Sequence, residues 1–545
     1  MPTIEASKKD LESLVGRKFS REQLEEALLY VKGELDKIEG DSLTIDVKET
    51  NRPELWSVEG IARELRTKMG IDKGIRKYKV QKAKTECIIE KSVEKSRPFI
   101  ACAIVRNVKV TEELLVQMIQ LQEKIHLTFG RKRKEAALGI YDYDRIQGNI
   151  RYYGCIPREK KFIPLECKTE MDLDEILETH PKGREYAHLL KGHRAYPIFE
   201  DSKGNVLSMP PVINSNYSGK VTTETKNLFV EVSGFKWETI MAALNVMAMA
   251  FADRGGKVEA VTVVDSDGRK IVTPEFRENK ISINLENVNR ITGLGLKEKE
   301  IIELASRARY EVRKKGKKMV LAYGNYRNDI LHPVDVIEDI LIGYGYNHVK
   351  PVRPEMAVVG EELAETTKID RVRETCIGLG LQEVLTFVLT SREKQSKFVG
   401  LEESFVEIAN PISSNWCIMR KNIYPELLEF LSKNKGAEYP QKIFEVGKVV
   451  ELDHTSETKT SERSKLCIML SGKGAGFTQI KSMMQAVCRE LGLKFGLKEI
   501  THPSLTKGRA AQITDRCNGI IGELSEETKR NFGLEQDTAL LEMEI

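Results

Sequence analysis

The sequence RNDILHPVDVIEDILIGYGY, residues 327–346, decides how the segment around it folds. Proline is favoured in the first turn of a helix, so Pro333 predicts a helix that begins at His332 or Pro333 and continues to Leu341 or beyond. With about 100° of rotation per residue, four apolar side chains share one side of this helix. The expected core face consists of Val334, Ile337, Leu341 and Tyr344.

The opposite side of the predicted helix is crowded with acids. Four of them fall within eleven residues: Asp329, Asp335, Glu338 and Asp339. Like charges at helical spacing repel by roughly 0.2–0.5 kcal/mol per pair, so a positive partner is expected beside them. Carboxylate oxygens favour a hard cation such as Mg²⁺. The helix dipole, solvent or basic side chains explain the same acids without a metal, and the spacing leaves both interpretations open.

The composition describes an ordinary multidomain protein. The chain has 545 residues, of which 41% are hydrophobic and 31% charged, and a chain of this length is expected to form three to five domains. Lys and Arg number 86 against 82 for Asp and Glu, so net charge does not indicate a nucleic-acid partner. The nine cysteines include no CxxC pair, which favours reduced thiols. A cytoplasmic location is expected, because the first residues are charged where a signal peptide is apolar.

Local patterns predict the element types along the chain. Ser20 and Gln23 form a capping-box pattern, ahead of a predicted helical face made of Leu24, Ala27, Leu28, Val31 and Leu35. Alternation over residues 43–47 predicts a strand, and a helix is expected around residues 58–65. The apolar segment 239–252 is too short to span a bilayer and is expected to be a buried helix. The proline-rich segment 349–360 is expected to be a linker.

Four segments resemble the β subunit of phenylalanyl-tRNA synthetase of the archaeal and eukaryotic cytosolic type. They are DVKETNRPELWSVEGIAREL (46–65), YRNDILHPVDVIEDILIGYGYN (326–347), ANPISSNWCIMRKNIYPELLEFLSKNKG with KIFEVGKVVE (409–451), and GIIGELSEETKRNFGLE (519–535). They occur in the order typical of the family and span nearly the whole chain. The resemblance implies an α+β multidomain fold, with an N-terminal α/β domain at 1–85 and a mixed editing domain at 86–270. A winged-helix-like domain at 271–350 and a C-terminal class II synthetase-like antiparallel sheet domain at 351–545 would follow.

The resemblance also implies ligands and partners. In this family the acids of the second segment bind Mg²⁺, which places the metal ligands at Asp329, Asp335, Glu338 and Asp339. The expected partners are the α subunit, in an α2β2 heterotetramer, and tRNA(Phe), with no membrane. Two other functions remain alternatives: a self-sufficient Mg²⁺-dependent phosphoryl-transfer enzyme and a winged-helix nucleic-acid-binding protein.

The chain lacks the residues that aminoacylation requires. A class II active site uses one arginine in an fRxE element and a second in a GxGxxR element to stabilise the phosphates. Arg420 has no acid two residues later, and GRAAQI (508–513) lacks the second pattern. The run SGKGAG (471–476) does not have P-loop spacing. No catalytic residue for aminoacylation is therefore expected in this chain.

Proofreading is the activity that the resemblance assigns to the middle of the chain. The polar segment 206–227 offers side chains able to bind a ribose, a tyrosyl hydroxyl or a water: Ser208, Asn214, Asn216, Thr223 and Thr225. A well-capped surface loop is the alternative interpretation of this segment. The basic runs GRKRK (130–134) and RKKGKK (313–318) are candidate tRNA phosphate contacts or simply solvated turns.

Overall fold

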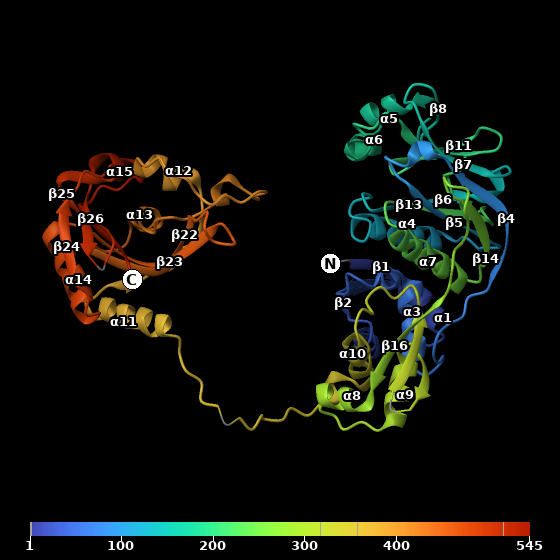
Figure 1. Ribbon diagram of the computed structural model, residues 1–545, viewed down its shortest axis with the longest axis horizontal. Helices are drawn as coiled ribbons and strands as arrows, with labels where there is room; N and C mark the ends of the chain where they lie inside the picture. The colour runs from blue at the N-terminus through green and yellow to red at the C-terminus, as the bar shows by residue number, and fades with distance from the viewer. Residues whose placement is uncertain (1–2, 317, 357, 516) are drawn as a thin grey trace. The chain divides into compact units, whose positions relative to one another are not determined.

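The chain forms two compact units, Met1–Arg353 and Pro354–Ile545. The computed structural model describes residues 3–316, 318–356, 358–515 and 517–545 (Figure 1). The break between the units falls in the predicted linker 349–360, of which Ala357 lies outside the described residues. Within the described part of the chain, no helix is long and apolar enough to cross a membrane.

The first unit begins with a three-stranded sheet of order β1-β3-β2. Its elements are β1 (Thr3–Ser7), α1 (Lys8–Val15), α2 (Arg21–Leu29), β2 (Gly33–Glu39), β3 (Ser42–Val47) and α3 (Val58–Lys68). The capping box of Ser20 and Gln23 is present at the start of α2, as predicted. Val31 and Leu35 were wrongly predicted on this helical face, and Val31 lies in the turn that follows the helix. The helix ends at Leu29, and Leu35 lies in β2, where it pairs with Ile45.

A ten-stranded sheet forms the centre of the first unit, in the order β12-β11-β10-β7-β4-β14-β5-β13-β6 with β15 beside β14. Its strands are β4 (Val80–Ile89), β5 (Phe99–Arg106), β6 (Ala136–Asp142), β7 (Ile150–Cys155), β10 (Tyr196–Asp201), β11 (Val206–Met209), β12 (Ile213–Asn214), β13 (Leu228–Gly234), β14 (Lys257–Val264) and β15 (Lys270–Thr273). Helix α7 (Trp237–Asp253) contains the predicted buried segment and packs on β5 and β13, and α4 (Glu112–Leu127) packs on β6. Between β7 and β10 lie β8 (Lys161–Phe162), β9 (Met171–Asp172), α5 (Leu173–Thr179) and α6 (Pro181–Tyr186).

The third part of this unit contains the helix that the opening sequence predicts. A sheet of order β16-β18-β17 packs with three helices around one apolar cluster. The elements are β16 (Glu278–Asn284), α8 (Leu285–Thr292), α9 (Glu298–Arg307), β17 (Glu311–Lys315), β18 (Lys318–Gly324) and α10 (Pro333–Tyr344). The basic run 313–318 includes the end of β17 and the first residue of β18, and its Lys317 lies outside the described residues.

Helix α10 begins at Pro333 with His332 as its N-cap, as predicted, but its buried face differs from the prediction. Val336, Ile337 and Ile340 are buried, whereas Val334 is 42% exposed. Asp339, which was expected on an open acidic face, is only 7% exposed. Asp339 can be buried because its carboxylate accepts hydrogen bonds from Arg327 and Tyr310, both at 2.7 Å. A buried charge is tolerated when it is paired and hydrogen-bonded in this way.

The second unit is built on a seven-stranded sheet of order β19-β22-β23-β27-β26-β25-β24, antiparallel except where β19 pairs with β22. Period-2 alternation buries both faces: Leu466 and Ile468 of β23 pack with α11 and α14, and Cys467 and Met469 pack with α13. The helices are α11 (Ala364–Gly378), α12 (Arg392–Gln395), α13 (Tyr424–Lys433), α14 (Phe477–Glu490) and α15 (Glu526–Asn531). The strands are β19 (Gln382–Glu383), β20 (Leu389–Thr390), β21 (Ile418–Met419), β22 (Gln441–Leu452), β23 (Thr460–Ser471), β24 (Phe495–Glu499), β25 (Leu505–Asp515), β26 (Gly519–Leu524) and β27 (Thr538–Glu544).

Candidate functional site

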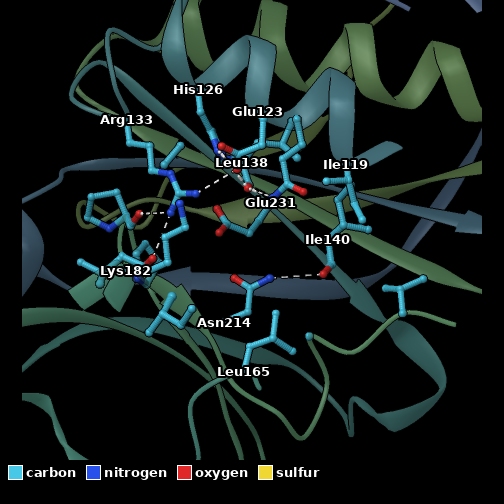
Figure 2. Close-up of a pocket in the computed structure, with 18 of the residues that line it drawn as sticks. Ile119, Glu123, His126, Arg133, Leu138, Ile140, Leu165, Lys182, Asn214 and Glu231 are labelled. Carbon is cyan, nitrogen blue, oxygen red and sulfur yellow. Dashed lines mark hydrogen bonds and ion pairs between the residues drawn. The ribbon is translucent and has the colours of Figure 1, made fainter. Parts of the chain in front are cut away.

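A pocket of about 490 Å³ opens beside the edge of the ten-stranded sheet, between α4, β6, β13 and the segment that follows β11 (Figure 2). Much of its wall is apolar, and a few polar side chains converge on it. Such a combination is typical of a small-ligand site. The apolar wall includes Leu115, Met118, Ile119, Leu138, Ile140, Leu165, Val212 and Val221.

A buried carboxylate forms one wall of this pocket. Glu231 on β13 is 3% exposed, and its Oε1 accepts a hydrogen bond from the hydroxyl of Tyr141 at 3.1 Å. The same hydroxyl lies 2.8 Å from Oγ of Ser208. Among the described residues, Oε2 of Glu231 has no hydrogen-bond partner. Burial raises the pKa of Glu231 to about 7. The pocket is therefore lined by a carboxyl group that is readily protonated near neutral pH.

Gly139 makes room for that carboxylate. It lies on β6 directly opposite Glu231. A Cβ at this position would lie 2.4 Å from the Tyr141 hydroxyl and 2.7 Å from Oε1 of Glu231. Any side chain here would displace the two groups that define the polar end of the pocket, so this position requires glycine for space.

Arg133 and Glu123 connect two walls of the pocket. Nη1 of Arg133 donates to the carbonyl oxygens of Pro211 and Val212 at 3.3 and 3.0 Å, and Nη2 donates to Glu123 at 3.0 Å. Glu123 lies on α4, so the guanidinium joins this helix to the segment after β11 (Figure 2). The guanidinium also lies over the Tyr186 ring, 4.3 Å from the ring centroid.

His126 is a fixed, neutral member of the same wall. Its Nε2 lies 2.8 Å from the Leu138 nitrogen, which donates to it, and 3.0 Å from the Leu138 carbonyl oxygen, while Nδ1 lies 3.3 Å from Oε1 of Glu123. Burial lowers the pKa of His126. The hydrogen bond from His126 is the main cause that lowers the pKa of Glu123 to about 2 against the opposing effect of burial, and the charge of Arg133 contributes less. Both histidine nitrogens are therefore occupied, which makes His126 a poor candidate for a general base.

The residues predicted for this site have different locations. Asn214 and Asn216 line the pocket, and Nδ2 of Asn214 donates weakly to the Ile140 carbonyl at 3.4 Å. Ser208 is buried and is not among the lining residues, and its Oγ lies 2.8 Å from the hydroxyl of Tyr141, which donates to the lining residue Glu231. Thr223 is exposed, and the Thr225 hydroxyl accepts the Thr222 N–H at 3.2 Å. Neither threonine is among the lining residues.

The pocket residues that the sequence did not single out come from other segments. Glu123 and His126 lie on α4, Arg133 in the turn after it, and Glu231 on β13. The available signal was an acid within the apolar strand LFVEVSG, because a buried strand seldom carries an unpaired carboxylate.

The four acids around α10 do not converge on one point. Oδ2 of Asp335 accepts the N–H groups of Leu331 and His332 at 2.8 and 2.6 Å, which caps the helix. Glu338 pairs with Lys32 at 2.9 Å. Arg327 bridges the remaining two, at 2.5 Å from Asp329 and 2.7 Å from Asp339.

These protein cations supply the positive partners that the acids require. Burial alone would raise the pKa of Asp339, but the charges of Arg327 and Arg52 overcome it and hold the pKa at about 2. Within the described residues, no three His, Cys, Asp or Glu side chains are placed to hold one metal ion. The donor atoms suit Mg²⁺, but their present positions do not form its ligand set. Magnesium at these acids stays a prediction that requires them to leave their present partners.

Comparisons with known protein families assign this chain to a class. Residues 281–346 match the tRNA synthetase B5 domain, and residues 99–252, which contain most of the pocket, match the B3/4 domain. Residues 349–545 match the phenylalanyl tRNA synthetase beta chain CLM domain. The domain set is therefore that of a tRNA synthetase component.

Comparisons with whole proteins identify the family. The chain is 45% identical to the phenylalanine–tRNA ligase beta subunit of Pyrococcus horikoshii over 550 residues, covering 100% of this chain and 99% of that protein. It is 44% identical to the corresponding subunit of Thermococcus sibiricus, covering 100% and 98%. The crystal structure of an N-terminal fragment of the Pyrococcus horikoshii subunit matches 63% of this chain and 100% of the fragment, with a TM-score of 0.62 and 47% identity. The chain belongs to the family of phenylalanine–tRNA ligase beta subunits.

Proposed function

We propose that this chain supports the ATP-dependent attachment of phenylalanine to tRNA(Phe) by an α subunit, within a cytoplasmic α2β2 heterotetramer. Membership of the beta-subunit family over the full chain length supports this assignment. In the same proposal, residues 271–350 are a winged-helix-like domain and residues 351–545 a class II synthetase-like domain without synthetic activity. The self-sufficient phosphoryl-transfer enzyme and the stand-alone nucleic-acid-binding protein have no support from the comparisons.

The environment of Arg420 supports the division of labour between the two subunits. This arginine is 1% exposed and pairs with Glu445 at 2.8 Å. Its Nε donates to the Lys448 carbonyl at 2.9 Å, and Nη1 donates to the Thr386 hydroxyl at 2.8 Å. A guanidinium engaged in this way has no free face for the α-phosphate of ATP, which is the interaction that stabilises charge in the synthetic transition state.

We further propose that the pocket beside the ten-stranded sheet hydrolyses Tyr-tRNA(Phe). The observation that carries this proposal is the free Oε2 of buried Glu231 in a largely apolar pocket. A tyrosyl hydroxyl can donate to this oxygen, whereas a phenylalanyl ring leaves a buried carboxyl unpaired. A hydrogen-bonding site rejects the analogue that lacks the hydroxyl far better than an apolar site rejects an added one.

The ester is cleaved in this proposal by a positioned water rather than by a protein nucleophile. His126 has both nitrogens occupied, and Asn214 and Asn216 offer amide groups at the pocket for a ribose hydroxyl or a water. Glu231 and its partner Tyr141 would then determine which side chain is accepted.

The assignment to a supporting subunit is tested by charging assays. The purified chain alone is expected to form no Phe-tRNA(Phe) from ATP, phenylalanine and tRNA, and addition of the matching α subunit is expected to restore charging. Formation of Phe-tRNA(Phe) by the chain alone would refute the division of labour.

A further inference from the structure

Arg97 is a buried cation that forms no ion pair with any carboxylate of the described residues. It immediately precedes the proline before β5 and is 2% exposed. Its Nε donates to the Ser233 hydroxyl at 2.9 Å and its Nη2 to the Ser233 carbonyl at 2.7 Å. Further bonds from Nη2 to the Arg133 carbonyl at 3.1 Å and from Nη1 to the Lys134 carbonyl at 3.2 Å complete the set. These partners are neutral, so the interaction fixes main-chain positions rather than balancing charge.

The main chain that Arg97 binds has an unfavourable conformation. Arg131, Lys132 and Arg133 have φ angles of 47°, 54° and 64°, so three consecutive residues with side chains adopt the left-handed region. This region is disfavoured for L-residues, and a run of three is unusual. A run of this kind persists only where the surrounding structure holds it. Arg97 donates hydrogen bonds to the carbonyl oxygens of Arg133 and Lys134, at the end of this run.

This turn determines where the Arg133 side chain lies. The Arg133 guanidinium joins Glu123 on α4 to the Pro211 and Val212 carbonyls on the opposite wall of the pocket. A shift of the turn would therefore move this link, and the pocket walls with it. Arg97 itself does not line the pocket.

We propose that Arg97 is a positioning residue for the hydrolytic pocket, acting through the left-handed turn 131–133 and Arg133. This inference rests on the proposed function of the pocket. Burial lowers the pKa of Arg97 to about 10, so the guanidinium remains charged at neutral pH and keeps all its donors. Lysine cannot replace it, because one ammonium group cannot reproduce the planar set of donors that spans three carbonyls and a hydroxyl.

A double-mutant cycle on the α–β complex tests the proposal. Arg97→Lys and Arg133→Ala are each expected to lower kcat for hydrolysis of Tyr-tRNA(Phe) by about 10- to 100-fold, since small misplacements at a reactive site cost about this much. The double variant is expected to be no slower than Arg133→Ala alone, because both act through the same guanidinium. Arg151→Lys is the matched control, since Arg151 is half exposed, pairs with Glu90 and should retain full hydrolysis.

The outcomes separate the inference from the function on which it rests. Absence of hydrolysis by the unmodified complex would refute the proposed function. If that complex does hydrolyse the ester, two results would each refute the role of Arg97. One is a double variant whose loss of kcat equals the product of the two single losses. The other is a folded Arg97→Lys variant with full activity. If Arg97→Lys does not fold, Ser233→Ala is the substitute, because it removes only the hydroxyl that accepts the hydrogen bond from Nε of Arg97. The inference then predicts a reduced kcat for Ser233→Ala, and no further reduction when this change is combined with Arg133→Ala. Unchanged kcat in Ser233→Ala would refute it.

Discussion

The hydroxyl of Tyr141 donates to the carboxylate of Glu231 across two neighbouring strands, and both side chains are buried. The register of β6 against β13 sets this contact, because Glu231 pairs with Gly139 and Tyr141 pairs with Phe229. Tyr141 satisfies Oε1, whereas Oε2 has no hydrogen-bond partner in the part of the chain that the structure describes, and Glu231 lines the pocket. The pair therefore presents a preformed acceptor to a ligand hydroxyl.

Glu231→Leu should abolish the preference of the pocket for tyrosyl esters. Leucine removes the acceptor for the ligand hydroxyl, so the ratio of kcat/KM for Tyr-tRNA(Phe) to that for Phe-tRNA(Phe) should fall by at least about 100-fold. Deacylation of the two purified aminoacyl-tRNAs by the α–β complex measures this ratio. Glu259→Leu is the control, since Glu259 is equally buried but pairs with Arg106 on β5. An unchanged ratio in Glu231→Leu would exclude Glu231 as the selecting group.

The raised pKa of Glu231 should affect stability between about pH 4.5 and 7. Its pKa is raised from 4.5 to about 7 by burial, so in this range the folded chain holds a proton that the unfolded chain has released. The free energy of unfolding should therefore decrease as pH rises through this window, by at most about 1.4 kcal/mol per pH unit, and this contribution should be constant above it. Urea unfolding of the wild type and Glu231→Gln at several pH values gives the comparison. Parallel pH profiles for the two proteins would contradict the raised pKa.

Arg327→Met should destabilise the first unit strongly. The substitution leaves Asp329 and Asp339 close together without the guanidinium that bridges them, and breaking a buried ion pair from one side costs about 3–5 kcal/mol. Arg307→Met provides a control, because Arg307 is 40% exposed and pairs with Glu303 on the same helix, an interaction of about 0.5 kcal/mol. Urea unfolding is the measurement. Equal effects of the two substitutions would show that Arg327 has no special role.

Chelation should leave the isolated chain stable. Arg327, Arg52 and Lys32 neutralise the acids around α10, so EDTA should not change the midpoint of thermal unfolding of the chain without its partner. Magnesium at these acids is instead expected where a second subunit draws them from their present partners, and metal analysis of the α–β complex before and after Asp335→Asn tests that prediction. A lowered midpoint in EDTA that Mg²⁺ restores would show that the chain alone holds the ion.

Local sequence signals identified several elements of the fold. The capping box at Ser20 and the proline at position 333 each marked a helix start that the structure confirms. These signals act within one turn of helix, so neighbouring residues suffice to recognise them. Leu35 was misplaced because a continuous apolar period crosses the turn at residues 30–32, between the end of α2 and the start of β2 at Gly33.

The candidate site was harder to predict because its geometry is tertiary. Asn214 and Asn216 lie in one polar segment and could be proposed from sequence, but Glu123, which lines the same pocket, lies about 90 residues earlier in the chain, and Glu231 lies in the next strand, β13. The acids around α10 show the same limit. Their spacing predicted that a positive charge lies beside them, and the structure confirms this. Only the fold shows that the positive charges are those of Arg327 and Lys32.

Hydrolysis of preformed aminoacyl-tRNA by the α–β complex tests the proposed activity of the pocket most directly. The account predicts rapid release of tyrosine from Tyr-tRNA(Phe) in the absence of ATP, with Phe-tRNA(Phe) hydrolysed at least about 100-fold more slowly. Equal stability of the two esters in the presence of the complex would contradict it.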